Sequence, residues 1–155
     1  MKTIILYATK YGAATEIAQR IAKKIEGAFL YNLNQGDLSL AEFDCVIIGS
    51  SVYAGSIRKE AKAFLSQNAN ALHEKKLGLF LCGIDAESAN KYFDDNFPKE
   101  IMQKAKAVCF AGGIFNPKKA NGAERFIIKL ITKKSSLIDT IDEKKIELFA
   151  QEMKA

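Results

Sequence analysis

The sequence is poor in proline, cysteine and histidine, and it has no long apolar run. Two prolines and 10 glycines among 155 residues, 48% of which are hydrophobic, are typical of a packed globular domain and exclude collagen-like and disordered chains. No apolar run approaches the roughly 18 residues that a transmembrane helix needs. The apolar stretch within residues 1–6 turns polar by Thr9, too early for a signal peptide. We therefore expect one soluble domain over residues 1–155.

Cysteine and histidine are too few and too scattered to form disulfide or metal sites. Cys45, Cys82 and Cys109 are an odd number, which favours reduced thiols in a cytoplasmic protein over a disulfide framework. All three lie in apolar runs, where thiols usually behave as small hydrophobes, and only Cys82 is close enough to the end of its run to raise a redox question. The one histidine, His73, and the unclustered cysteines predict no metal site.

Short apolar runs alternate with helical patterns along the chain, with no internal repeat and no linker. Within residues 16–25, for example, Ile17, Ile21 and Ile25 recur at helical spacing with charged residues between them. Strands that are apolar throughout and separated by helices predict a parallel sheet covered on both faces. The sequence therefore predicts an α/β fold, a doubly wound five-stranded parallel sheet with helices on both faces. The expected strands are residues 3–7, 28–31, 45–48, 77–82 and 107–111, and the expected helices lie within residues 16–25, 61–72, 87–104 (broken at Pro98), 126–131 and 142–153.

The first loop, residues 8–15, suits a phosphate group. Ligands of a doubly wound sheet bind outside the carboxyl ends of the strands, so we expect the segments after strands one, three, four and five to build the site. Thr9, Gly12 and Thr15 lie at a strand-to-helix turn, where free helix N–H groups attract an anion and a glycine lets the backbone close around it. The loop lacks the Gly-Lys-Ser/Thr ending of a P-loop and the further glycines of a dinucleotide site, which favours a terminal monophosphate. The same residue types are also ordinary turn and cap residues.

The other three segments offer backbone groups and aromatic rings but no catalytic pair. Residues 49–57 hold Tyr53 and Gly55, which suit a flat polar heterocycle better than a reacting side chain. Residues 83–88 are short and acidic, whereas residues 112–119 combine two glycines, one aromatic residue and two lysines. The paired acids of a receiver domain and the Cys-x5-Arg loop of a phosphatase are both missing. We therefore predict no catalytic side chain.

Four stretches of the chain resemble, in the same order, the flavodoxin fold family. They are YATKYG at residues 7–12, IGSSVYAG at 48–55, AGG at 111–113 and RFIIKL at 125–130. The chain is most similar to the short flavodoxin-domain proteins that include the menaquinone-dependent protoporphyrinogen IX dehydrogenases. The resemblance implies a flavodoxin-like fold and FMN bound without a covalent link.

The resemblance also implies where FMN would lie. The loop after the first strand would cradle the ribityl phosphate, and residues 51–55 would edge the isoalloxazine ring. The family usually has a threonine or serine at the place of Ala14, so it stays open which hydroxyl of this chain would meet the phosphate, with Thr15 next along. The cofactor-binding residues expected on this basis are Thr9, Lys10, Tyr11, Gly12, Ala13, Ala14, Thr15, Ser51, Val52, Tyr53, Ala54, Gly55, Gly83 and Gly113.

Three functions follow from the resemblance. The first is an FMN-binding electron carrier or small flavin oxidoreductase that exchanges electrons with a redox partner protein or a quinone. The second is a quinone-linked protoporphyrinogen IX dehydrogenase of heme biosynthesis, whose substrate is an anionic porphyrinogen. The basic charge of the chain, +5, favours this second branch over the usually acidic electron carriers, whereas the short acidic segment 85–96 does not. The third is a flavodoxin-like binding module without a cofactor.

A basic stripe follows the fifth strand. Arg125, Lys129 and Lys133 recur every four residues, with Lys134 alongside, on a helix whose other face, with Phe126, is apolar. The stripe predicts either a solvated outer face or a docking surface for an anionic partner, a lipid surface or porphyrin carboxylates. A nucleic-acid partner is not expected, because no reading motif accompanies the charge. We expect a cytoplasmic protein whose contact with the inner face of the membrane is at most peripheral.

Overall fold

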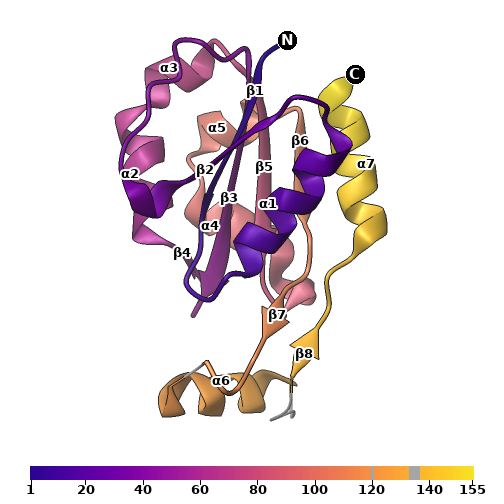
Figure 1. The fold of residues 1–155 in the computed structure, drawn as a ribbon. Coiled ribbons are helices and arrows are strands. Elements are labelled where there is room, and N and C mark those ends of the chain that lie inside the picture. The colour runs from indigo at the N-terminus through magenta and orange to yellow at the C-terminus, as the bar shows by residue number, and fades with distance from the viewer. Residues whose placement is uncertain (120, 133–136) are drawn as a thin grey trace.

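A five-stranded parallel sheet forms the centre of the computed structural model, which describes residues 1–119, 121–132 and 137–155 (Figure 1). The parallel strands that these residues form lie in the order β2-β1-β3-β5-β6, so the predicted doubly wound sheet is confirmed. The order reverses beside β1, which makes the carboxyl ends of β1 and β3 the switch point at which ligands of such sheets bind. The strands are β1 (Thr3–Ala8), β2 (Phe29–Asn32), β3 (Cys45–Tyr53), β5 (Lys76–Cys82) and β6 (Ala107–Phe110).

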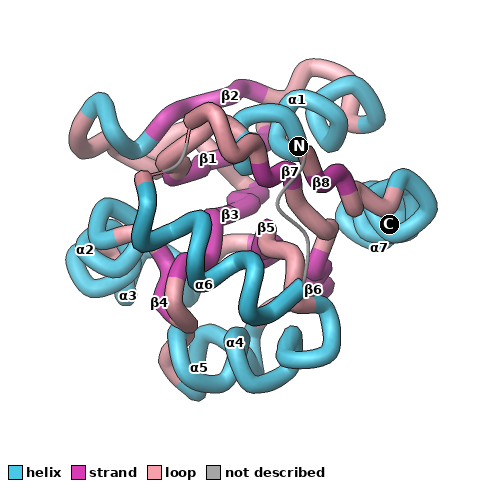
Figure 2. Tube along the Cα trace, turned by 90° about the horizontal axis from the view of Figure 1, so that it is seen from below, coloured by secondary structure: helices cyan, strands magenta, loops and turns pink. Residues whose placement is uncertain are grey.

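Helices cover both faces of this sheet, as the sequence predicts (Figure 2). Helices α1 and α7 lie against one face, and α2, α3, α4 and α5 lie against the other. The predicted break at Pro98 is confirmed, and Asp142 caps α7 by accepting a hydrogen bond from the backbone N–H of Lys145. The helices are α1 (Ala13–Lys24), α2 (Lys59–Gln67), α3 (Ala69–His73), α4 (Ala89–Asn96), α5 (Lys99–Lys104) and α7 (Glu143–Lys154), with short 3-10 turns η1 (Leu33–Gln35) and η2 (Ala86–Ser88).

The apolar runs are buried because each strand feeds two cores. Successive side chains of a strand point to opposite faces. In β1, Ile4 and Leu6 join the core under α2 to α5, whereas Ile5 and Tyr7 join the core under α1 and α7. A strand with helices on both sides has no solvent face, which is why its sequence is apolar throughout.

Strand β3 is longer than expected. The sequence predicts its end at Ile48, but β3 continues to Tyr53 and turns back as β4 (Ser56–Ile57). Ser50 fits inside the sheet because its buried hydroxyl donates to Ser51 O at 2.9 Å and accepts from the backbone N–H of Arg58, also at 2.9 Å. The Gly-Ser-Ser sequence therefore does not end the strand, since the Ser50 hydroxyl finds partners inside the sheet.

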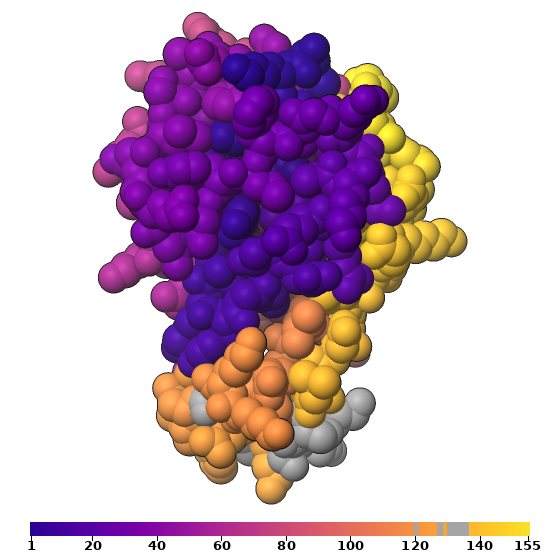
Figure 3. Space-filling model, viewed as in Figure 1, coloured from indigo at the N-terminus to yellow at the C-terminus, as the bar shows by residue number. Residues whose placement is uncertain are grey.

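The chain between β6 and α7 forms a projection that we call the arm: β7 (Ile114–Phe115), α6 (Gly122–Thr132) and β8 (Ile138–Asp139). Strands β7 and β8 pair in an antiparallel ladder and carry α6 beyond the carboxyl ends of the sheet, at the end opposite to both termini (Figures 1 and 3). The sequence predicts the helix but not the strands, since two-residue strands show no periodicity.

The side chains of the arm only partly follow the expected amphipathic pattern. Phe126, which the sequence places on the apolar face of this helix, is 63% exposed. Arg125 and Lys129 are exposed, as the basic stripe requires. The rest of the expected apolar face and stripe lies outside the side chains that the structure describes: Ile127, Leu130, Ile131, Lys133 and Lys134. None of the helices described is long and apolar enough to cross a membrane.

Candidate functional site

A cavity of about 90 Å³ lies at the carboxyl ends of the strands, under the arm. It is lined by the loop after β1, the ends of β3 and β5, the segments after β5 and β6, and Glu124 of α6, so all four segments that the sequence predicts contribute to it. Eight of the predicted cofactor residues line it: Lys10, Tyr11, Ala13, Ser51, Val52, Tyr53, Gly83 and Gly113. Thr9, Gly12, Ala14, Thr15, Ala54 and Gly55 lie in the same loops but do not line this cavity. The lining residues that sequence reasoning did not name as cofactor residues are Cys82, Ile84, Ile114, Phe115 and Glu124.

The loop after β1 is closed on itself by Thr9. The backbone N–H of Gly12 donates to Thr9 Oγ1 at 2.9 Å, and Asn34 Nδ2 donates to Thr9 O at 3.1 Å. Gly12 has a φ of 99°, a left-handed conformation that favours glycine, and it precedes the first turn of α1. Ala14 is fully buried in the core beneath α1, whereas Thr15 is half-buried. The predicted phosphate loop is therefore rigid and lies at the start of a long helix.

The hairpin between β3 and β4 is held in place by a residue of α4. Tyr53 pairs with Ser56 across a two-residue turn, in which Ala54 has a φ of 50° and Gly55 a φ of 80°. A left-handed alanine is strained. Asn96 clamps this turn, because its Nδ2 donates to Gly55 O at 2.8 Å and its Oδ1 accepts from the next strand, β4. No local sequence signal predicts this clamp, since its partners lie about 40 positions away in the chain.

The glycines after β5 and β6 let three backbone segments meet beside the cavity. The N–H of Gly83 donates to Gly112 O at 3.0 Å, and a Cβ atom added to Gly113 would lie only 3.1 Å from the backbone of Gly83. Gly112 has a φ of 80°, and a Cβ atom there would lie 2.0 Å from Thr140 O. The strands that carry the arm therefore leave the sheet through a joint that only glycine fits.

One polar atom of the cavity wall has no partner. Ser51 Oγ is buried and forms no hydrogen bond with any residue that the structure describes. A buried hydroxyl without a partner is unfavourable by about 1–3 kcal/mol. Beside it, Val52, Ile84 and Phe115 supply apolar surface. An apolar slot with a few polar groups at its edge is the usual form of a site for a flat, partly polar ligand.

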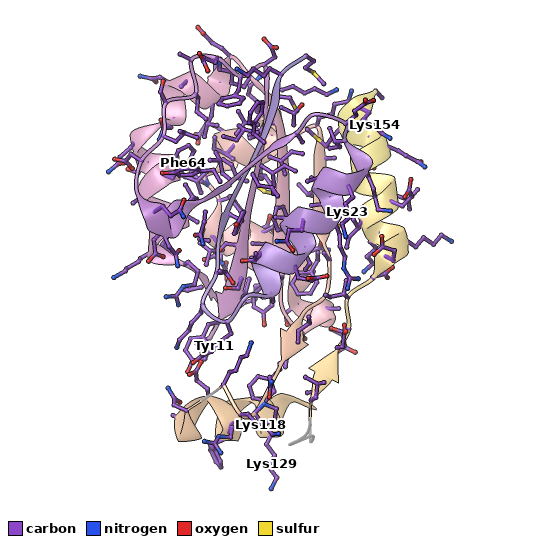
Figure 4. All side chains as sticks on the ribbon, viewed as in Figure 1. Tyr11, Lys23, Phe64, Lys118, Lys129 and Lys154 are labelled. Carbon is purple, nitrogen blue, oxygen red and sulfur yellow. The ribbon has the colours of Figure 1, made fainter. Side chains whose placement is uncertain are left out.

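Glu124 brings a carboxylate from the arm into the loop after β1. Its side chain is only 3% exposed, and its Oε2 lies 3.2 Å from Lys10 Nζ. Its Oε1 accepts a hydrogen bond from Tyr11 OH, and Tyr11 reaches from its loop toward the first turn of α6 (Figure 4). Burial alone would raise the pKa of the Glu124 carboxyl, but the hydrogen bonds from Tyr11 and Lys10 outweigh it and lower that pKa. Glu124 is therefore ionised at neutral pH.

Glu124 also caps its own helix. Asn121 Oδ1 accepts from the backbone N–H of Glu124 at 2.8 Å, and Glu124 Oε1 accepts from the backbone N–H of Asn121 at 3.4 Å. This reciprocal pair is a capping box. The Asn-x-x-Glu spacing is a sequence signal that predicts the helix start. It does not predict the contact with Lys10, which lies 114 positions earlier in the chain.

Lys10 lies between two aromatic rings. Its Nζ is 4.8 Å from the centre of the Tyr53 ring and 5.2 Å from the centre of the Tyr11 ring. Such distances allow cation–π attraction. The hydrogen bond to Glu124 raises the pKa of Lys10 above its ordinary value. The side chains of Lys10 and Glu124 thus narrow the cavity from the side of the predicted phosphate loop.

Cys82 lines the cavity, but its thiol is unreactive. Its side chain is buried at the end of β5, and desolvation raises the pKa of its thiol well above the ordinary value. The thiolate is the reactive form of cysteine. The redox question raised by the position of Cys82 is therefore answered by its burial, which keeps the thiol protonated.

Comparisons with known proteins relate this architecture to one family. A family model described as "Flavodoxin domain" matches residues 4–140. The flavodoxin of Fusobacterium nucleatum bound to flavin mononucleotide is 19% identical at a TM-score of 0.54, over 99% of this chain and 98% of its own. Flavodoxin 1 from Bacillus cereus is 16% identical at a TM-score of 0.57, over 99% and 97% of the two chains. No curated protein matches the chain in sequence.

A larger protein contains a similar domain. The rubredoxin oxygen:oxidoreductase of Desulfovibrio gigas is 14% identical at a TM-score of 0.56 and matches 98% of this chain. The match spans only 35% of that protein, so this chain corresponds to about a third of its length. At such low identities these likenesses establish a shared fold.

Proposed function

We propose, from the premise that this chain belongs to the flavodoxin-domain family of electron-transfer flavoproteins, that it binds FMN in the cavity at the carboxyl ends of its strands. One observation carries the proposal. The two loops that the resemblance assigns to FMN, residues 9–13 and 51–55, meet at one cavity, and a buried hydroxyl of its wall, Ser51 Oγ, has no partner among the described residues.

The residues around the cavity fit the parts of FMN. Residues 9–13, at the start of α1, would hold the phosphate, because helix N-termini favour anions. Residues 51–55 and Gly113 would border the ring, with Val52 as its apolar neighbour. When bound, the flavin supplies the one- or two-electron chemistry, and the protein supplies orientation and tunes the potential.

The chain's own contribution is to orient the ring. Asn96 keeps the β3–β4 hairpin in a fixed conformation, so that its backbone groups cannot reorient freely. Ile84, which lines the cavity, packs against Phe115 and Ile138. No side chain has to move a proton, which agrees with a site that orients a cofactor.

The spectrum of the purified protein tests this proposal. We expect a yellow preparation with flavin absorbance bands, and heat denaturation should release a nucleotide that mass spectrometry identifies as FMN. A colourless preparation should bind added FMN and quench its fluorescence. A colourless protein that stays unchanged in excess FMN would contradict the proposal and support the cofactor-less binding module.

A second candidate is a quinone-linked protoporphyrinogen IX dehydrogenase, which the charge of the arm favours. Residues 114–139 hold six basic and two acidic residues, and the remainder of the chain holds 17 and 16. Exposed Arg125 and Lys129 belong to the same helix as Glu124, which lines the cavity, and they would attract the carboxylates of a porphyrinogen. Oxidation of protoporphyrinogen with a quinone as acceptor tests this candidate. If no turnover is observed, the remaining candidate is an electron carrier that exchanges electrons with a redox partner protein.

The same charge supports a peripheral contact with membranes. Arg125 and Lys129 are exposed near Phe126, a combination typical of surfaces that bind anionic lipids. The double variant Arg125→Glu/Lys129→Glu should lose binding to vesicles that contain anionic lipid. The matched control Lys23→Glu/Lys154→Glu changes the charge equally at the other end of the molecule (Figure 4) and should retain it. Equal vesicle binding by both variants would contradict the proposed membrane contact.

A further inference from the structure

The arm is fastened to the loop after β1 by a single charged cluster, which we call the latch: Glu124 with Lys10 and Tyr11. Among the described residues, the Glu124–Lys10 pair is the one ion pair that joins the arm to the rest of the chain. The other attachment is apolar, where Ile84 packs against the β7–β8 ladder. The latch lies at the first turn of α6, and the capping box with Asn121 ties the carboxylate to that turn. A movement of Glu124 therefore moves the start of the helix.

The latch occupies the donors that the cofactor would need. Lys10 and Tyr11 belong to the loop that would hold the phosphate of FMN, and both direct their donor groups to the Glu124 carboxylate. A phosphate that carries up to two negative charges would meet a third negative charge at the same loop. Like charges in one partly buried site repel each other strongly.

The exchange of one anion for another is feasible for the same reason. Breaking a buried ion pair is unfavourable because it leaves a charge without a partner. If a phosphate takes the place of the carboxylate, Lys10 keeps an anionic partner. Glu124 is then free to reach water at the exposed start of α6, where Asn121 and Gly122 are exposed. The phosphate thus replaces the anionic partner that Lys10 would otherwise lose when the arm opens.

The latch also borders the cavity. Lys10 and Glu124 both line it, and Lys10 Nζ lies 4.8 Å from the centre of the Tyr53 ring. A displacement of Glu124 therefore opens the cavity on the side of the predicted phosphate loop.

We propose that Glu124 holds the arm against the loop after β1 and that a phosphate monoester binding to Lys10 and Tyr11 releases it. This inference rests on the proposed function, since it takes FMN as the ligand. It gives Glu124, which lies 114 positions from Lys10 in the chain, the role of controlling access to the predicted phosphate loop. The arm, which carries the basic surface, is then open in the cofactor-bound protein and closed without cofactor.

The variant Glu124→Gln tests the competition. Glutamine keeps the capping box, because Gln serves at this position as well as Glu, and it removes the negative charge. Fluorescence titration should show FMN bound about tenfold more tightly or better than by the wild type, since the competing anion is gone. The control Asp139→Asn removes an acid from the same arm outside the latch and should change the FMN affinity by less than about twofold.

Hydrogen exchange of the wild-type protein gives a second test that needs no variant. FMN should accelerate exchange of the backbone amides at the start of α6, because it opens the arm. Riboflavin, which has the same ring but no phosphate, should leave their exchange unchanged. Slower exchange with FMN, or equal acceleration by riboflavin, would overturn the latch.

The outcomes separate this inference from the proposed function. If neither the wild type nor Glu124→Gln binds FMN, the proposed function fails and the latch fails with it. If the wild type binds FMN and Glu124→Gln binds it equally or more weakly, the latch alone is wrong, and Glu124 then orients Lys10 and Tyr11 for the cofactor.

Discussion

The sheet and the arm are built on opposite principles. Every side chain of β1 is buried and the chain outside residues 114–139 is almost neutral, whereas the arm exposes Phe126 and Leu137 by more than 60% and holds most of the net charge. Burial of apolar surface stabilises the sheet. Exposed apolar and basic side chains stabilise nothing within the chain and are available to a partner. The contrast indicates that the sheet stabilises the fold and that the arm provides a surface for binding partners.

The largest expected effect concerns the thiols of the sheet. Burial raises the pKa of Cys109 to about 12. At pH 8 an ordinary thiol with a pKa near 8.5 is partly ionised, so Cys109 should be alkylated by iodoacetamide about three orders of magnitude more slowly in the native protein than in urea. Its native rate should keep rising with pH up to about 12, because only the thiolate reacts. Equal alkylation rates with and without urea would show that the sheet opens readily and would contradict the contrast between a buried sheet and an exposed arm.

Truncating one phenylalanine in each region compares the two directly. Phe80 is fully buried in β5, and Phe80→Ala should lower the free energy of unfolding by about 3–5 kcal/mol, because it leaves a cavity in the core. Phe126→Ala in the arm should change it by less than about 0.5 kcal/mol. Urea unfolding followed by circular dichroism measures both. A similar loss for Phe126→Ala would mean that the arm contributes to the stability of the fold.

The joint between the two regions should be nearly as sensitive as the core. In Gly112→Ala the new Cβ atom meets Thr140 O, and the residue has a left-handed φ, so we expect a loss of about 3 kcal/mol in unfolding free energy. The control is Gly122→Ala at the start of α6, where a Cβ atom meets nothing within 4 Å. It should be neutral or stabilise by up to about 1 kcal/mol. If both variants lose stability equally, the close approach at Gly112 is not the cause.

The smallest expected effect concerns the β3–β4 turn, where the sheet meets the cavity. Ala54→Gly relieves a left-handed alanine in the β3–β4 turn and should raise the free energy of unfolding by about 1 kcal/mol. The same substitution at the exposed helical residue Ala63 should lower it by about 1 kcal/mol, because glycine weakens a helix. Thermal unfolding of the two variants is enough to see opposite signs. A loss of stability in Ala54→Gly would show that the turn is not strained.

Features that depend on neighbours in the chain were predictable. The alternation of apolar runs and helical patterns predicts the parallel sheet, Pro98 predicts the break between α4 and α5, and Asp142 predicts the start of α7. The position of the cavity follows from the strand order of such a sheet. Each of these inferences uses residues a few positions apart, for which spacing alone carries the physical constraint.

Features that depend on distant partners were not predictable. The sequence GSSVY looks like the end of a strand, yet β3 continues through it because β5 pairs with its backbone and Arg58 donates to the Ser50 hydroxyl. Asn96 and Glu124 show no local sign of the hairpin or the loop that they hold. Such contacts join residues that are brought together only when the sheet forms.

The amino-acid sequence by itself determined the layered α/β fold, the edge of the sheet at which a ligand would bind and the loop suited to a phosphate, because periodicity and turn chemistry act over a few residues. Only the tertiary structure decided that a carboxylate from the arm reaches that loop and that the same arm exposes Arg125 and Lys129. Those facts depend on how far and in which direction the chain travels after β6, and local patterns do not encode such a path.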